Sequence, residues 1–226
     1  MTNNFSTFKN GNTHLLFKQY YTPDFINNIY EIIRPMYESE ITDKTKMYKQ
    51  LNHNTKGNYN YTLNSKNTPD FNHLQTILND FNTLIRNELI INNNSFVNRN
   101  FSINLTEVNL CITRQNTLPT NIVKTQYINI FIPLHNFPNG TVTIFKDADD
   151  IIQKYYNIDH DNKIINYGNP SNYEQDDINE LLNKELYIDT FVGDVLIINN
   201  GVFSRSIPNM IDYDRYCLQL LYDIKI

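Results

Sequence analysis

The sequence lacks several features that would mark a secreted, nucleic-acid-binding or membrane-spanning protein. It has no tryptophan and only two cysteines, too few for a disulfide framework, so Cys111 and Cys217 are expected to be buried, reduced thiols. Phosphate neutralisation needs clustered cations, and no run of five Lys or Arg residues occurs in this chain of formal net charge −5. The apolar runs are too short to span a membrane, and the N-terminal stretch lacks the apolar core of a signal peptide. We therefore expect no nucleic-acid partner, no membrane and no classical secretion.

The composition indicates a folded chain from an AT-rich genome. Hydrophobic residues make up 40% of 226 residues, which is enough for the core of one domain. The 38 asparagines, with many Ile, Tyr and Lys, are what AT-rich codons encode whatever the function. A large DNA virus, a protist and a low-GC bacterium all fit this composition. The expected location is cytoplasmic or virion-associated.

The first hundred residues have helical periodicity. Thr22 can cap a helix that has Pro23 at its first position and an Asp at 24, and apolar residues then recur at helical spacing. Pro35 is expected to end or bend this helix. A second start at 68–70 precedes another apolar stripe. The polar stretch between them, 38–67, is expected to be a long loop with short strands.

From about residue 101 the hydrophobic period changes to two, which indicates strands. A polar, acidic insertion at about 146–186 interrupts them and is expected to hold one or two helices. Helices followed by strands favour an α+β fold, with an antiparallel barrel or sandwich against the helices. We expect one domain, 1–226, with a mainly helical flank at 1–100 and the barrel strands at 101–226.

Four segments carry a resemblance to a known family: LCITRQN at 110–116, YINIFIPL at 127–134, GDVLIINNGVFSRSIPN at 193–209 and DYDRYCLQLLYDI at 212–224. In order and spacing they resemble strands of the 2-oxoglutarate/Fe(II)-dependent oxygenases, specifically the phytanoyl-CoA-dioxygenase-like branch. The resemblance implies a double-stranded β-helix, a jelly-roll barrel with N-terminal helices packed against it.

The resemblance also implies where iron ligands are expected, and the motif is degenerate there. Such a centre needs two histidines and one carboxylate on one face. In place of the family's His-x-Asp pair stand Pro119 and Asn121, or residues of 114–116 on an alternative alignment, and Ser204 replaces the distal histidine. None of the five histidines begins a His-x-Asp or His-x-Glu triplet. No metal site and no catalytic residue are therefore predicted.

One basic residue matches the position at which the family grips its cosubstrate. Arg215 begins the last apolar segment, and a guanidinium suits bidentate carboxylate binding. It is therefore a candidate cosubstrate or anion-binding residue, and an ion pair with Asp212 or Asp214 is the alternative. Strand alternation places Ser204 and Ser206 on one face, with Arg205 outward on the other.

The sequence is compatible with three functions. The first is a catalytically degenerate oxygenase-like protein that acts as a non-catalytic binding or structural module and needs no cofactor. The second is an active phytanoyl-CoA-dioxygenase-like enzyme with atypical ligands, which would need Fe(II) and 2-oxoglutarate. The third is a jelly-roll structural or virion protein, since jelly rolls share this alternation. A protein partner or self-association is compatible with the first and third.

Overall fold

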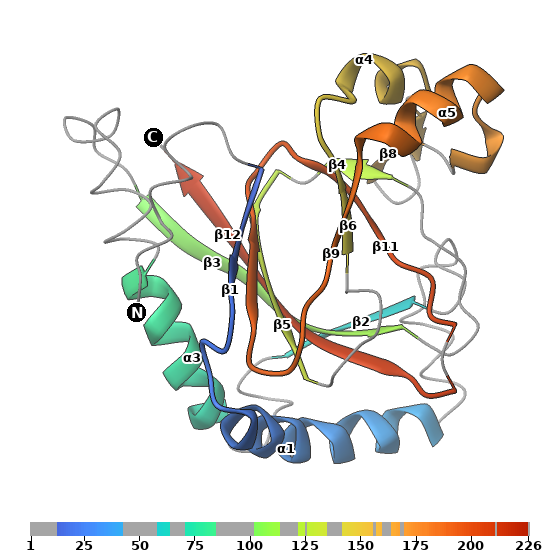
Figure 1. Cartoon of the computed structure of the whole chain (residues 1–226). Helices are drawn as coiled ribbons and strands as arrows, with labels where there is room; N and C mark the ends of the chain where they lie inside the picture. Colours follow the sequence, from blue (N-terminus) through green and yellow to red (C-terminus); the bar gives the residue numbers. More distant parts are fainter. Residues whose placement is uncertain are drawn as a thin grey trace.

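The computed structural model shows two antiparallel sheets that face each other, with helices on the outer side of each (Figure 1). The residues that the structure describes are 13–42, 58–63, 71–84, 102–113, 122–124, 126–134, 142–155, 157–159, 164–167, 170–210 and 212–225. Among these residues, no helix is long and apolar enough to cross a membrane.

The large sheet has six strands in the order β1-β10-β5-β12-β3-β2, and all its pairs are antiparallel. Its strands are β1 (His14–Phe17), β2 (Asn58–Thr62), β3 (Ser102–Thr113), β5 (Ile128–Pro133), β10 (Val195–Ile198) and β12 (Arg215–Lys225). β1 comes from the flank that periodicity assigned mainly to helices, whereas β2 confirms a short strand within the polar stretch 38–67. The longest pairing joins β12 to β3 and has one irregularity, between Leu221 and Tyr222.

The small sheet also has six strands, in the order β7-β8-β4-β11-β6-β9. Its strands are β4 (Val123–Lys124), β6 (Val142–Phe145), β7 (Asn157–Asp159), β8 (Ile164–Asn166), β9 (Glu185–Ile188) and β11 (Phe203–Ser206). From β3 onwards the chain crosses repeatedly between the sheets: β3, β5, β10 and β12 lie in the large sheet, and β4, β6, β9 and β11 lie in the small one. This is jelly-roll connectivity. Closure of the two sheets into a barrel remains a prediction.

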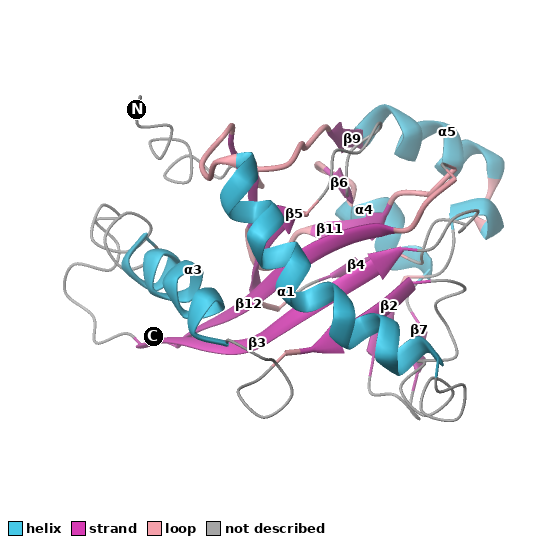
Figure 2. Ribbon diagram, turned by 90° about the horizontal axis from the view of Figure 1, so that it is seen from below, coloured by secondary structure: helices cyan, strands magenta, loops and turns pink. Residues whose placement is uncertain are grey.

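Helices α1 (Pro23–Thr42) and α3 (Phe71–Leu84) lie across the outer face of the large sheet (Figure 2). The predicted start of α1 is confirmed, because the Phe25 backbone N–H donates to Thr22 Oγ1 at 3.3 Å and Pro23 occupies the first helical position. The expectation that Pro35 could end this helix is wrong, since α1 continues to Thr42. The predicted start at 68–70 lies outside the described residues.

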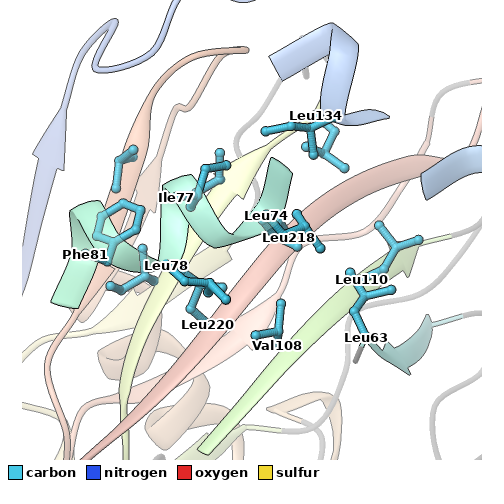
Figure 3. Close-up of a cluster of buried hydrophobic side chains, with 14 of the residues drawn as sticks. Leu63, Leu74, Ile77, Leu78, Phe81, Val108, Leu110, Leu134, Leu218 and Leu220 are labelled. Carbon is cyan, nitrogen blue, oxygen red and sulfur yellow. The ribbon is translucent and has the colours of Figure 1, made fainter. Parts of the chain in front are cut away.

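The main hydrophobic core fills the space between these helices and the large sheet. Figure 3 shows side chains of α3, including Leu74 and Phe81, against Val108 of β3 and Leu218 and Leu220 of β12. Alternate strand residues supply this core, as the period of two requires. Its strand members are Leu15, Val108, Leu110, Ile112, Ile128, Ile130, Ile132, Val195, Ile197, Leu218, Leu220 and Tyr222.

The insertion covers the outer face of the small sheet. One or two helices were expected there, and the insertion contains two, α4 (Asp149–Ile152) and α5 (Gln175–Lys184), which lie beside β4, β6 and β8 in Figure 1. It also contains strands β7 and β8 and the short 3-10 turns η3 (Gln153–Tyr155) and η4 (Pro170–Asn172), which periodicity did not predict. A second core, which includes Phe145, Leu181 and Phe203, joins α4 and α5 to the sheet.

A tight turn before β10 contacts the segment 18–21, which precedes α1. Gly193 has a φ of +88°, and a Cβ there would lie 2.4 Å from the backbone oxygen of Tyr21. The next residue, Asp194, is buried and accepts hydrogen bonds from the Gln19 N–H and from Lys18 Nζ, both at 2.9 Å. This turn therefore positions α1, which follows Tyr21, relative to the strands.

Candidate functional site

The candidate site lies on the face of the large sheet that looks toward the small sheet. Phe131 of β5 belongs to this face, because it packs with Ile144 and Ile188 of the small sheet. Gln219 of β12 pairs with Phe131, so it shares the face, while its neighbour Leu218 points to the helices. We call this the inner face. It carries the following residues of β3, β5 and β12: Glu107, Asn109, Cys111, Thr113, Asn129, Phe131, Arg215, Cys217 and Gln219.

Polar side chains of the inner face form a hydrogen-bonded network. Gln219 is its centre: Nε2 donates to Asn129 Oδ1 at 2.9 Å, and Oε1 accepts from Cys111 Sγ at 3.4 Å. Beside it, Asn109 Nδ2 donates to Glu107 Oε2 at 3.0 Å. Asn109 and Asn129 are buried, so they need such partners to offset the loss of water. These residues are therefore held in defined orientations.

Strand β11 contributes serines to the space between the sheets. The resemblance implied a hairpin at 193–209, and this expectation is wrong, because β10 lies in the large sheet and β11 in the small one. Ser204 pairs with Ile144 and Ser206 with Val142, and both partners belong to the apolar cluster between the sheets. Arg205 points the other way and forms an ion pair with Glu185 on the outer side of the small sheet. The predicted alternation, with the two serines inward and Arg205 outward, is confirmed.

Arg215 is a buried cation at the start of β12, on the inner face. Its guanidinium donates to the backbone oxygen of Ile207, just after the end of β11, so the side chain bridges the two sheets. Burial lowers the pKa of Arg215 to about 10, which leaves it charged at neutral pH. Asn209 holds the connecting loop, since Nδ2 donates to Thr113 O at 2.8 Å and to Tyr213 O at 2.9 Å.

Both roles predicted for Arg215, binding an anion or pairing with Asp212 or Asp214, remain predictions. The geometry adds one constraint to them. Arg215 lies on the inner face, and its guanidinium donates to the backbone oxygen of Ile207, which two residues separate from Ser204 in the chain. A carboxylate held by Arg215 would therefore lie between the two sheets.

The residues around Ser204 do not fit an iron centre. Across the two adjacent strands Ser204 pairs with Val123 and Ile144, whose side chains have no donor atom. The earlier candidates, Pro119, Asn121 and 114–116, lie outside the described residues. The whole segment 114–127, between β3 and β5, nevertheless contains no His, Asp, Glu or Cys in its sequence. Within the described ranges, no group of three such residues could hold a metal ion.

Sequence reasoning missed two parts of this site. Val123 was not singled out, because its position opposite Ser204 depends on the pairing of β4 with β11. The amides Asn109, Asn129 and Gln219 were also missed, although a signal was present for two of them. Asn129 and Gln219 are each a polar residue inside a largely apolar strand, where a solvent-facing strand side would be polar throughout. Asn109 gave no such signal, because its side of β3 also carries Glu107 and Thr113.

Comparison with solved structures identifies the fold. The chain is similar to SnoK, a non-heme alpha-ketoglutarate-dependent carbocyclase from nogalamycin biosynthesis, with a TM-score of 0.64 and 8% identity over 98% of this chain and 83% of that one. It is similar to HygX from Streptomyces hygroscopicus, a structure with nickel and 2-oxoglutarate bound, with a TM-score of 0.60 and 8% identity over 98% and 87%. A Pseudomonas putida prolyl-4-hydroxylase matches with a TM-score of 0.53 and 9% identity over 93% and 91%.

The chain thus has the fold of the 2-oxoglutarate-dependent oxygenases. No family model matches the sequence. No curated protein matches it either. The identities of 8–9% establish the shared architecture, and function has to be argued from the site itself.

Proposed function

We propose that this protein is a non-catalytic binding or structural module built on the oxygenase fold. The observation that carries the proposal is the environment of Ser204. Its neighbours across the sheet, Val123 and Ile144, cannot ligate a metal, and the segment 114–127 supplies no imidazole or carboxylate. Three ligands on one face are required for an iron centre with open positions, and the expected positions hold Pro119, Asn121 and Ser204 in place of two histidines and a carboxylate.

The resemblance of the strand segments 127–134 and 212–224 supports a finer placement, in the phytanoyl-CoA-dioxygenase-like branch. A polar inner face supports the binding role. A fold that needed only stability could fill this space with apolar residues, because buried polar groups contribute little net stability even when they are hydrogen-bonded. The ligand position we propose is Arg215, whose buried guanidinium suits a carboxylate.

The first experiment tests the loss of iron chemistry. Protein purified without chelator is analysed for metals, then titrated with Fe(II) and 2-oxoglutarate while succinate formation is followed. We expect no stoichiometric iron and no turnover above a buffer control. Tightly bound iron together with 2-oxoglutarate consumption would overturn the proposal and favour an active enzyme with ligands from outside the expected motif.

The second experiment tests the anion position. The melting temperature is measured with 2-oxoglutarate and with succinate in the absence of metal, for the wild type, Arg215→Met and the matched control Arg205→Met. Arg205 points to the outer face, so its variant keeps the ligand-induced shift relative to its own ligand-free midpoint. Arg215→Met loses that shift. An equal shift in all three proteins would remove Arg215 from the proposal.

A further inference from the structure

The two cysteines of the chain face each other across the longest strand pair. Cys111 of β3 is paired in register with Cys217 of β12. The flanking pairs, Thr113 with Arg215 and Asn109 with Gln219, are regular, and the one irregularity lies beyond Leu221. Both thiols are free, and both lie on the inner face. Their opposition is therefore a fixed feature of the sheet.

The geometry of this pair suits a disulfide. The Leu134 N–H donates to the Tyr216 oxygen at 3.0 Å, so even-numbered residues at this end of β12 direct their backbone groups to β5 and odd-numbered ones to β3. Cys217 and Cys111 are thus a hydrogen-bonded pair, in which opposite Cα atoms lie about 5.5 Å apart. Disulfides join Cα atoms about 4.4–6.8 Å apart, a range that this pair meets. The bond also needs Cβ atoms about 3.5–4.5 Å apart, whereas opposite Cβ atoms in a sheet lie about 4.5–5.5 Å apart, so the two strands have to move closer by roughly 1 Å.

We propose that Cys111 and Cys217 are a modification site at which a hydroperoxide or a small disulfide forms a reversible cross-strand disulfide. With a hydroperoxide, the sulfur of Cys111 attacks the peroxide oxygen, the O–O bond breaks, and a sulfenic acid and one molecule of water or alcohol result. The sulfur of Cys217 then displaces the hydroxyl group, which leaves as water with the thiol proton. Two thiols lose two electrons, and one peroxide gains them. With a small disulfide, the sulfur of Cys111 breaks the S–S bond and forms a mixed disulfide with release of one small thiol, and the sulfur of Cys217 then displaces the second small thiol.

Oxidation changes the inner face as well as the thiols. The Cys111 thiol donates to Gln219 Oε1, and Gln219 in turn donates to Asn129. A disulfide has no S–H group, so it removes the first of these bonds and frees the amide to reorient. Arg215 is two residues from Cys217 on the same face. The proposal stands on strand register alone and does not depend on the binding function proposed above.

Burial of the two thiols determines the rate of their oxidation rather than its product. Burial raises the pKa of Cys111 to about 12 and raises the pKa of Cys217, so both are protonated at neutral pH. Since the thiolate is the attacking species, we expect oxidation to be slow at neutral pH and to accelerate about tenfold per pH unit below the pKa. Such a pair responds to sustained oxidation and not to a brief pulse.

The test uses the full-length folded chain. Reduced protein is treated with hydrogen peroxide or glutathione disulfide at pH 7 and pH 9, blocked with an alkylating agent and digested with trypsin without reduction. Cys111 and Cys217 fall in separate tryptic peptides, 100–114 and 216–225. We expect these two peptides to be linked, more rapidly at pH 9, and to separate on reduction. Cys111→Ser and Cys217→Ser give no linked product.

A second measurement does not depend on the variants folding. The melting temperature of the oxidised wild type is compared with that of the reduced wild type, and a cross-link between distant parts of the chain is expected to raise it. The same oxidation is repeated in denaturant. Linked peptides that appear only in denaturant, or only sulfinic acids and intermolecular disulfides from the folded protein, would overturn the proposal.

Discussion

The two sides of strand β12 differ in the chemistry of the side chains that they present. Toward the helices it presents Leu218, Leu220 and Tyr222, which are fully buried in the main core. Toward the small sheet it presents Arg215, Cys217, Gln219 and Leu221, and Arg215 and Gln219 are charged or polar. Apolar burial is worth about 25 cal/mol per Å², whereas a buried polar group has to recover its lost hydration through hydrogen bonds. The helix side therefore carries the stability.

The space between the two sheets has an apolar part and a polar part. The apolar part lies around β6, β9 and β10. Its residues are Val142, Ile144, Ile188, Leu196, Ile198 and Val202. The polar residues gather on β3, β11 and β12 and at Asn129 of β5. Under the proposed function, Arg215 in this polar part would bind a ligand with a carboxylate. The following variants test this division.

The largest expected effect is on the helix side. Leu218→Ala removes a fully buried side chain between α3 and the sheet, and we expect a loss of about 2–5 kcal/mol in the free energy of unfolding. Its neighbour Gln219, changed to Met, is the matched control from the opposite side of the strand. Urea unfolding monitored by circular dichroism measures both. Equal losses would show that the inner side contributes as much stability as the core.

The inner network predicts non-additive losses. Gln219→Met leaves Asn129 Oδ1 and the Cys111 thiol without their bonds to this amide, at a cost of about 1–3 kcal/mol. Adding Asn129→Leu removes the Asn129 oxygen that has lost its bond to Gln219, so the double variant is expected to recover part of the lost free energy of unfolding. A double-mutant cycle in urea gives the coupling energy. Simple additivity would mean that the network is not a unit.

A smaller effect concerns pH. His14 lies in β1 on the inner side, and burial, with a lesser contribution from Lys146, lowers its pKa from the usual 6.5. The unfolded chain then binds the proton more tightly, so the stability contribution is complete above pH 6.5 and is lost as the pH falls toward the folded-state pKa. We expect His14→Gln to flatten the melting-temperature profile between about pH 5 and 7. An unchanged slope would assign the effect to other groups.

The smallest effect is expected at the degenerate metal position. Ser204→Ala removes one hydroxyl at a site with apolar neighbours, and stability should change by no more than about 0.5 kcal/mol. Ser204→His restores a single ligand and is not expected to create an iron site, because Val123 offers no donor. Iron binding by this variant, measured by metal analysis after dialysis, would show that further ligands are present.

Much of the fold could be predicted from local pattern. The start of α1 at Pro23 and the strands within 127–134, 185–191 and 193–209 follow from capping residues and from hydrophobic periods. The hairpin expected at 193–209 does not form, because β10 and β11 join different sheets. These signals are local because burial on one side of an element leaves its period in the sequence. The length of α1 beyond Pro35 did not follow, because tertiary packing can outweigh the cost of a proline.

The remaining features depend on which strands pair. β1 joins the sheet because His14–Phe17 pairs with Val195–Ile198, far away along the chain. The placement of Val123 opposite Ser204, and of Cys111 opposite Cys217, likewise follows from register between remote strands. A shift of one residue would turn each side chain to the other side of its sheet, and no local pattern specifies that register to the residue.

By itself, the sequence determined which residue types stand in each strand, and with them the lack of imidazole and carboxylate groups in 114–127 and the inward orientation of Ser204 relative to Arg205. The tertiary structure decided which of these residues meet: the amides of three strands around Gln219, the guanidinium of Arg215 against Ile207, and the two thiols. The reason is physical. Alternation along a strand is a property of neighbouring residues, whereas contact between strands arises only when the sheets assemble.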